Sequence, residues 1–272
     1  MYSFPIGVMM DSFRLPVDEA IEKAVAIGAQ GFQMYATHGE HAPENMTPAK
    51  IRELRDKMAS SGLVFSALCG DLGQGFADAE KNPMLIERSK RILDLAKELG
   101  TDIVTTHIGK VPDDSDEDTY KIMQEACFEL SRYADSIGSH FAIETGPETA
   151  LILKNFLDTL DSTGVAVNLD PANLVMVAGD DPVQAVYHLQ KYIVHTHAKD
   201  GVKLSYPIHD EVWGDLYFRE EPLGQGGVDF PAYLKALEDV GYRGFLTIER
   251  EVGENPAKDI ADAAKYLRGI MI

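Results

Sequence analysis

IVHTHAKD, from Ile193 to Asp200, begins with two apolar residues and then places polar side chains at every second position. Because a β-strand points alternate side chains to opposite faces, His195, His197 and Lys199 would project to one face of such a strand. Burying two imidazoles and an ammonium without partners is costly, so a strand of this kind usually borders a metal site, an ion pair or a ligand. For this stretch alone, a polar core that satisfies an inward histidine is an equal alternative.

The rest of the chain alternates short apolar runs with longer segments in which apolar residues have helical spacing. This alternation predicts βα units, and eight of them are enough to close a barrel. The predicted strands are Ile6–Met9, Phe32–Tyr35, Val64–Cys69, Ile103–Thr106, Phe141–Glu144, Val165–Asp170, Ile193–His197 and Phe245–Glu249. The predicted helices are Val17–Ile27, Pro48–Ser61, Pro83–Leu99, Glu117–Ile137, Thr149–Leu160, Pro182–Leu189, Phe230–Val240 and Pro256–Leu267. We therefore predict an α/β fold, a (β/α)8 TIM barrel, with residues 1–272 in a single domain.

One connection between a predicted strand and its helix is long, running from Gly201 to Gly227, and it contains the only tryptophan, Trp213. Loops of this length in compact folds are usually functional, so we expect a lid over the site.

Composition limits the partners of the chain. The formal charge of −19 repels phosphate backbones and anionic membrane surfaces, so we expect no nucleic-acid and no membrane partner. The two cysteines, Cys69 and Cys127, are too few for a disulfide scaffold and are expected to be free thiols. The N-terminal sequence lacks a basic region and a long apolar run, so we expect a soluble, cytoplasmic protein.

Four consecutive predicted strands end in Glu144, Asp170, His197 and Glu249. In a TIM barrel the C-terminal ends of the strands converge on the active site, and three carboxylates meeting there would repel one another without a cation. Oxygen-rich ligation with one imidazole suits a hard divalent ion, so we expect one metal ion, Mn²⁺ first, with Mg²⁺, Co²⁺ and Zn²⁺ as alternatives. The competing interpretation, helix caps or solvated rim charges, applies more easily to one such residue than to four.

Several segments carry a resemblance to a known superfamily. They are FAIET (141–145), NLDPAN (168–173), VHTHAKD (194–200), PLGQGGVDF (222–230) and GYRGFLTIE (241–249). On these segments the chain resembles, over nearly its whole length, the xylose-isomerase-like TIM-barrel superfamily of sugar isomerases and epimerases, which are related to type IV apurinic endonucleases. The resemblance to the ketose 3-epimerases of this group implies one metal held by Glu144, Asp170, His197 and Glu249. It also implies that Glu144 and Glu249 are the catalytic acid and base.

Departures from the superfamily pattern narrow the prediction. The endonucleases would require further histidines, and this chain has Gly70 and Asn173 near two of those positions, which together with the negative charge disfavours DNA repair. Many relatives have a glutamate where the second strand of this chain has Gln33, so this chain departs from them at one substrate contact or supporting contact. Glu251 shares a strand face with Glu249, and Glu249 is preferred because it directly follows the apolar run Phe245–Ile248.

Other residues near the predicted strand ends are candidate substrate contacts. His107 closes the fourth strand, and Arg219 resembles the arginine with which relatives hold a hydroxyl or phosphate group. Lys199 and Trp213 are further candidates. Structural alternatives exist for these four: a capping histidine, an ion pair of Arg219 with Glu220 or Glu221, a salt bridge between Lys199 and Asp200, and simple packing of the indole. Asn173 completes the set of candidate contacts.

The predicted reaction is the isomerisation or epimerisation of a sugar or sugar phosphate through a metal-stabilised enediolate, with the two glutamates, Glu144 and Glu249, moving the proton. A lyase or dehydratase acting on a keto-sugar or keto-inositol by β-elimination is the alternative, with His107, His195 or Lys199 as the acid. The third class considered is a non-catalytic sugar-binding barrel. The presence of both Glu144 and Glu249 disfavours it, because a protein that only binds sugar needs no acid–base pair.

No Gly-rich phosphate cradle stands out, which favours a free sugar or polyol as the carbohydrate substrate. The resemblance also implies a homo-oligomer, a dimer or tetramer.

Overall fold

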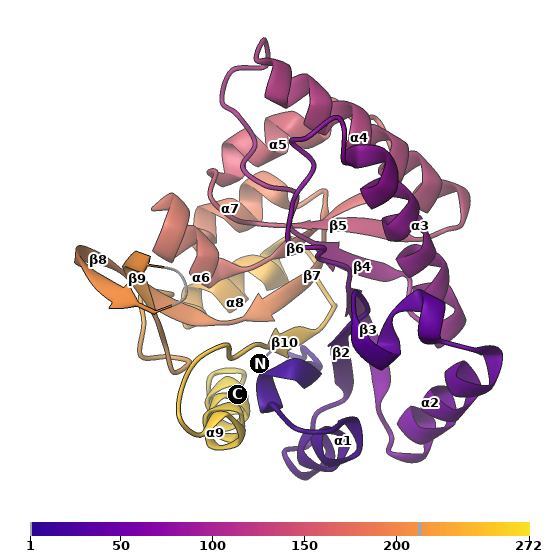
Figure 1. Ribbon diagram of the computed structural model, residues 1–272. Coiled ribbons are helices and arrows are strands. Elements are labelled where there is room, and N and C mark those ends of the chain that lie inside the picture. Colours follow the sequence, from indigo (N-terminus) through magenta and orange to yellow (C-terminus); the bar gives the residue numbers. More distant parts are fainter. Residues whose placement is uncertain (1, 212–213) are drawn as a thin grey trace.

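The computed structural model describes residues 2–211 and 214–272. Parallel strands close into a barrel in the order β1, β10, β7, β6, β5, β4, β3, β2 (Figure 1). These strands are β1 (Ile6–Met9), β2 (Gly31–Tyr35), β3 (Val64–Cys69), β4 (Ile103–Thr106), β5 (His140–Glu144), β6 (Val165–Leu169), β7 (Ile193–Ala198) and β10 (Leu246–Ile248). The predicted (β/α)8 barrel in a single domain is confirmed.

Long helices follow the barrel strands and form its outer layer (Figure 1). They are α1 (Val17–Ala26), α2 (Pro48–Ser60), α3 (Asn82–Leu99), α4 (Asp118–Ser136), α5 (Ala150–Asp158), α7 (Pro182–Leu189), α8 (Phe230–Asp239) and α9 (Pro256–Ile270). Each coincides with a predicted helix, and no end differs by more than three residues. Capping explains why α5 begins one residue later than predicted. Thr149 lies before the helix as its N-cap, and its side chain accepts a hydrogen bond from the Ile152 backbone N–H at 3.4 Å.

Short helical segments add detail that periodicity does not reveal. They are the 3-10 turns η1 (Met10–Phe13), η2 (Gly39–His41) and η3 (Pro43–Asn45), the short helix α6 (Pro171–Asn173) and the π-helical turn η4 (Leu174–Ala178). The last two follow β6 directly and lie beside the mouth of the barrel, where functional π-turns are often found.

The connection after β7, predicted as a long loop, is mostly an antiparallel hairpin of β8 (Asp200–Asp210) and β9 (Gly214–Glu221). It projects outward from the barrel (Figure 1). The pairing shifts register between Lys203 and Ile208, and Pro207 lies inside this shift, where its missing N–H is tolerated. Pro207 is therefore compatible with β8, although the sequence predicted a loop here. Trp213 lies outside the described residues.

The base of the hairpin is fixed by one buried carboxylate, that of Asp200. Its Oδ1 accepts from the backbone N–H groups of Gly201 and Val228 at 2.9 and 3.1 Å, and its Oδ2 accepts from Gly224 and Gly226 at 2.9 Å each. A Cβ at Gly226 would lie 2.2 Å from Asp200 Oδ1, so only glycine allows this approach. The glycine-rich segment after β9 thus wraps an internal carboxylate.

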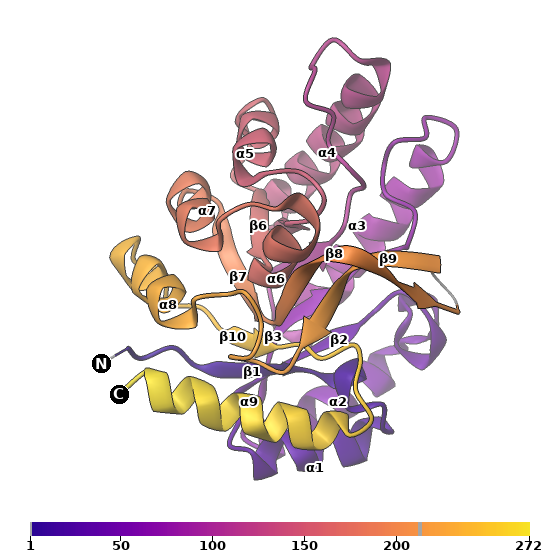
Figure 2. The ribbon, with the colours of Figure 1, turned by 90° about the vertical axis from the view of Figure 1, so that its left-hand side faces the viewer.

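The two ends of the described chain meet beside the barrel. Tyr2 donates its backbone N–H to the Met271 carbonyl at 2.8 Å, and α9 runs alongside β1 (Figure 2). Cys69 and Cys127 are buried free cysteines. None of the helices in the described part of the chain combines the length and apolar composition needed to cross a bilayer.

Replacing Asp200 with alanine should lower the free energy of unfolding by about 3–5 kcal/mol, because four backbone N–H groups lose their shared acceptor. Asp200→Asn should recover part of this loss, since one acceptor oxygen remains. Chemical denaturation measures the change. Asp113→Ala, at an exposed position, is the control, and an equally small effect at both sites would contradict the role given to Asp200.

Candidate active site

Four side chains converge at the C-terminal mouth of the barrel from adjacent strands. Glu144 ends β5, Asp170 follows β6, His197 lies in β7 and Glu249 follows β10. One nitrogen or oxygen atom from each lies within 4.8 Å of those of the others, and all four residues are buried. The barrel therefore brings together the four residues that the strand ends singled out, and we call them the four-residue cluster.

The four-residue cluster is centred on His197. Its Nδ1 lies 3.3 Å from Glu249 Oε2, 3.6 Å from Glu144 Oε1 and 3.6 Å from Asp170 Oδ2. Burial opposes the charged form of both glutamates, but His107 and His197 beside Glu144, and His197 and Lys199 beside Glu249, outweigh it and lower each pKa. Both carboxylates are therefore ionised at neutral pH.

Two atoms of the cluster fit a cation. His197 Nδ1 and Asp170 Oδ2 are buried, and neither has a hydrogen-bond partner within residues 2–211 and 214–272. Orphaned buried polar atoms are rare in folded proteins and call for an explanation. Carboxylate oxygens and an imidazole nitrogen aimed at one another form a donor set that suits Mn²⁺, Mg²⁺ or a similar divalent ion. The residues present thus fit a single divalent metal ion.

Asp170 has two roles, one for each oxygen. Its Oδ1 accepts from the backbone N–H groups of Ala172 and Asn173 at 2.8 and 3.1 Å, so Asp170 is the N-cap of α6. The cap fixes the carboxylate plane and leaves Oδ2 facing the cluster. The Thr145 hydroxyl, bonded to the backbone of Asp170, ties the ends of β5 and β6 together.

Gln33 orients the imidazole of His197. Its side-chain oxygen lies 3.1 Å from His197 Nε2, and its amide nitrogen donates to Thr105 Oγ1 at 2.9 Å. Burial opposes the charged imidazole, but Glu249 and Glu144 raise the pKa of His197 well above its usual value. With Nε2–H donating to Gln33, loss of the Nδ1 proton would leave a lone pair facing the cluster, which is the tautomer that a metal requires. The glutamine that departs from the superfamily pattern is therefore a buried supporting contact in this chain.

Asn168 and His195 form the layer below the cluster. Asn168 donates to Glu144 Oε2 at 2.9 Å, and its Oδ1 accepts from His195 Nδ1 at 2.8 Å. The other ring nitrogen of His195 lies 2.8 Å from the Thr247 hydroxyl. Burial, together with the adjacent His197, lowers the pKa of His195 well below its usual value, so it is neutral. With both ring nitrogens bonded inside the barrel, His195 supports Asn168 and does not face the mouth.

His107 stands at the rim of the cluster with its side chain 43% exposed. Its Nε2 lies 3.5 Å from Glu144 Oε1, and its Nδ1 lies 3.0 Å from Asp71 Oδ2. The Glu144 carboxylate, with help from Asp71, raises the pKa of His107 to about 9 against the effect of burial. An imidazolium therefore faces the mouth at neutral pH. Asp71 was not among the site residues predicted from the sequence. Its position two residues after the end of β3 could have indicated it, because strand ends border the mouth of the barrel.

The remaining predicted contacts lie in different places. Asn173 donates its amide to Glu144 Oε1 at 3.1 Å, so it holds the cluster as well as bordering it. Lys199 pairs with Glu249 at 3.0 Å and with Glu251, and not with Asp200. Arg219 lies on β9, 56% exposed, and pairs with Glu221. A substrate contact by Lys199 or Arg219 stays a prediction.

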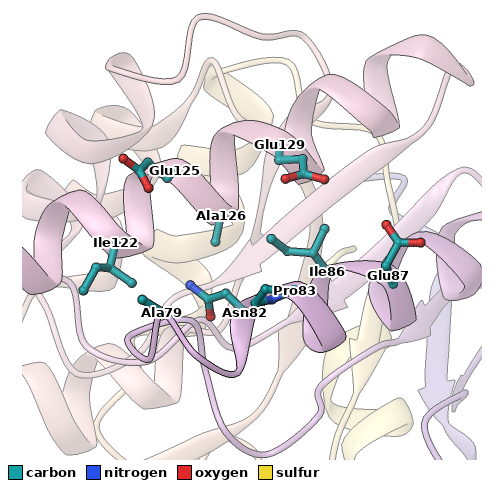
Figure 3. Close-up of a pocket in the computed structure, with 9 residues that line it drawn as sticks. All are labelled: Ala79, Asn82, Pro83, Ile86, Glu87, Ile122, Glu125, Ala126 and Glu129. Atoms are coloured by element: carbon teal, nitrogen blue, oxygen red, sulfur yellow. The ribbon is translucent and has the colours of Figure 1, made fainter.

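Two hollows open at the mouth and share Tyr35. One, of about 220 Å³, is lined by Glu249, Glu251 and Asp11, among others. The other, of about 420 Å³, extends past Asp71 toward α3. A separate groove of about 340 Å³ lies between α3 and α4, where acidic side chains border an apolar floor (Figure 3). This outer groove shares no residue with the four-residue cluster.

Comparison with known proteins gives a family. The model for the xylose isomerase-like TIM barrel matches residues 21–270. Among solved structures, a xylose isomerase domain protein from Planctomyces limnophilus superposes with a TM-score of 0.82 at 28% identity, covering 98% of this chain and 96% of that one.

Three curated relatives differ in length of match. The rhizopine catabolism protein MocC of Rhizobium meliloti is 37% identical over 98 residues, 32% of this chain and 28% of MocC. The putative L-ribulose-5-phosphate 3-epimerase SgbU of Haemophilus influenzae is 26% identical and covers 82% of this chain and 79% of its own. An inosose dehydratase of Klebsiella pneumoniae is 29% identical over 56% of this chain and 55% of its own.

Glu148 is a further buried carboxyl near the mouth. It is 4% exposed, and its Oε2 accepts from the Val111 backbone N–H at 3.2 Å. Burial raises its pKa to about 7 from an ordinary value of 4.5. Between these two values the folded protein keeps a proton that the unfolded chain releases, so this group makes stability fall as the pH rises from about 4.5 to 7.

Glu148→Gln should therefore stabilise the protein by about 2–3 kcal/mol at about pH 8 and change little near pH 4.5. The amide keeps the acceptor for Val111 and has no proton to lose. Urea unfolding of both proteins across this pH range tests the prediction, with the exposed Glu125→Gln as the control. A pH-independent difference would contradict it.

Proposed function

The chain belongs to the xylose isomerase-like TIM barrel family, and on this basis we propose that it is a divalent-metal-dependent sugar or sugar phosphate isomerase or epimerase. The observation that carries the proposal is the buried four-residue cluster, in which two glutamates flank an imidazole with an orphaned nitrogen. The similarity to a putative 3-epimerase over 82% of the chain supports the same reaction class.

In the proposed enzyme, Glu144, Asp170, His197 and Glu249 hold the metal ion. Manganese is our first choice, because oxygen ligands and one imidazole suit it. A divalent ion bound there would act as a Lewis acid that stabilises negative charge developing on the substrate oxygens. The protein prepares the ligands beforehand, since Gln33 sets the tautomer of His197 and the α6 cap sets the carboxylate of Asp170.

Glu144 and Glu249 are the proposed acid–base pair. Both are ionised, so either can accept the proton beside a substrate carbonyl. They come from opposite sides of His197, from β5 and from the end of β10, so one can remove a proton from one face while the other returns one to the opposite face. That sequence inverts a carbon, whereas a single group that shuttles the proton between carbons would isomerise the sugar.

A lyase or dehydratase is the second candidate, and His107 favours it. A charged imidazole that is half exposed at the mouth, with Asp71 fixing its other nitrogen, is placed to protonate a departing hydroxyl or glycosyl oxygen. The similarity to an inosose dehydratase over about half of the chain is consistent with elimination. Isomerase and lyase would begin with the same removal of a proton.

Metal binding is tested by calorimetry on protein that has been dialysed against EDTA. We expect one Mn²⁺ per chain, and turnover that is lost with EDTA and restored by Mn²⁺ or Mg²⁺. Asp170→Ala should weaken binding at least about 100-fold, since it removes a ligand. Glu148→Gln is the matched control, and equal weakening in both would argue against the four-residue cluster as the metal site.

The reaction is tested by NMR in D₂O with Mg²⁺ and a panel of ketoses, ketose phosphates and keto-polyols. We expect deuterium to enter the carbon beside the carbonyl together with inversion or isomerisation. Glu144→Gln and Glu249→Gln should each lower kcat by about 10²–10⁴-fold, because each removes a proton-transfer group. Loss of water or an aglycone would select the lyase, and unchanged kcat in either variant would refute the acid–base roles.

A further inference from the structure

Lys199 is a buried cation at the edge of the four-residue cluster. Its side chain is 5% exposed, and its Nζ lies 3.0 Å from Glu249 Oε2 and 4.0 Å from Asp170 Oδ2. A buried ammonium is tolerated only when anions surround it. Lys199 therefore depends on the same carboxylates that make up the cluster.

The ammonium and the imidazole approach the same two oxygens. His197 Nδ1 is 3.3 Å from Glu249 Oε2 and 3.6 Å from Asp170 Oδ2, the two oxygens nearest to Lys199 Nζ within the cluster. A divalent ion coordinated by these oxygens and by His197 would share them with a positive charge a few ångströms away. Like charges at such a distance repel, and more strongly at a buried site than in water.

Glu251 gives Lys199 a partner outside the cluster. Its carboxylate contacts the Lys199 ammonium and is 58% exposed, whereas that of Glu249 is 8% exposed. The backbone of Glu251 is anchored on both sides, because its N–H donates to the Glu220 carboxylate and its carbonyl accepts from Arg14 at 2.7 Å. The loop thus holds a second anion in reach of the ammonium whether or not Glu249 is available.

We propose that Lys199 competes with the divalent cation for Glu249, and that Glu251, which already contacts the ammonium, is the partner that retains it when the metal binds. The inference rests on the proposed metal site and adds a residue pair that tunes its affinity. In this arrangement Lys199 weakens metal binding, and Glu251 relieves part of that weakening. If Lys199 instead holds Glu249 in place, its removal has the opposite effect.

The test is calorimetric titration of Mn²⁺ alone into EDTA-treated protein at about 0.15 M salt, where distant charges are screened. Lys199→Met should bind Mn²⁺ about ten- to a hundredfold more tightly than the wild type. Glu251→Gln should bind severalfold more weakly, because the ammonium then relies on Glu249. In the double variant the effect of Glu251→Gln should largely disappear, since its partner is absent.

Matched controls separate this effect from a change in net charge. Lys203→Met and Glu254→Gln remove the same charges from exposed positions and should leave the affinity within about twofold. Equal or weaker binding by folded Lys199→Met would overturn the inference while leaving the metal site intact. If Lys199→Met fails to fold, unchanged affinity in Glu251→Gln overturns it. Absence of Mn²⁺ binding in every variant would remove the metal site and this inference together.

Discussion

Mutual repulsion of three buried carboxylates is the constraint on which this barrel depends. Two unit charges about 4 Å apart interact by about 4 kcal/mol in a partly buried setting, so Glu144, Asp170 and Glu249 need positive charge beside them. Three groups supply it within the described chain: His197 at the centre, Lys199 on one side and His107 on the other. A divalent ion bound at the proposed site would satisfy the same demand at the same oxygens, in competition with these protein cations.

A polar layer inside the barrel holds this charge in place. Gln33, Thr105, Asn168, His195 and Thr247 come from different strands and connect through hydrogen bonds of 2.8–3.1 Å to His197 and Glu144. Each strand of a closed barrel is fixed by two neighbours, so these side chains need little reorganisation when charge develops above them. The fold therefore gives the cluster rigidity from below, while the half-exposed His107 and the buried Lys199 flank it.

The hairpin after β7 connects the rim to the outer helices. Arg250, directly after the cluster residue Glu249, pairs with Glu220 of β9 at 2.6 Å and with Asp259 of α9 at 2.9 Å. Burial raises the pKa of Glu220 to about 7, and its carboxylate also accepts the Glu251 backbone N–H. Together with the Asp200 clamp, these contacts fix the loop that carries Glu251 and place it beside Lys199.

Local sequence was enough to predict the (β/α)8 order, the ends of the barrel strands and outer helices to within three residues, and the four residues at the strand ends, because strand and helix periodicity and strand direction are local properties. The tertiary structure alone decided what lies beside them. Gln33 reaches His197 from a strand 164 positions away in sequence, and Asp71 meets His107 across two strand ends. The partner of Lys199 proved to be Glu249 and Glu251 and not its neighbour Asp200, because barrel closure brings β7 and β10 together while Asp200 turns toward the glycine-rich backbone. Such pairings depend on closure of the barrel, which no local pattern encodes.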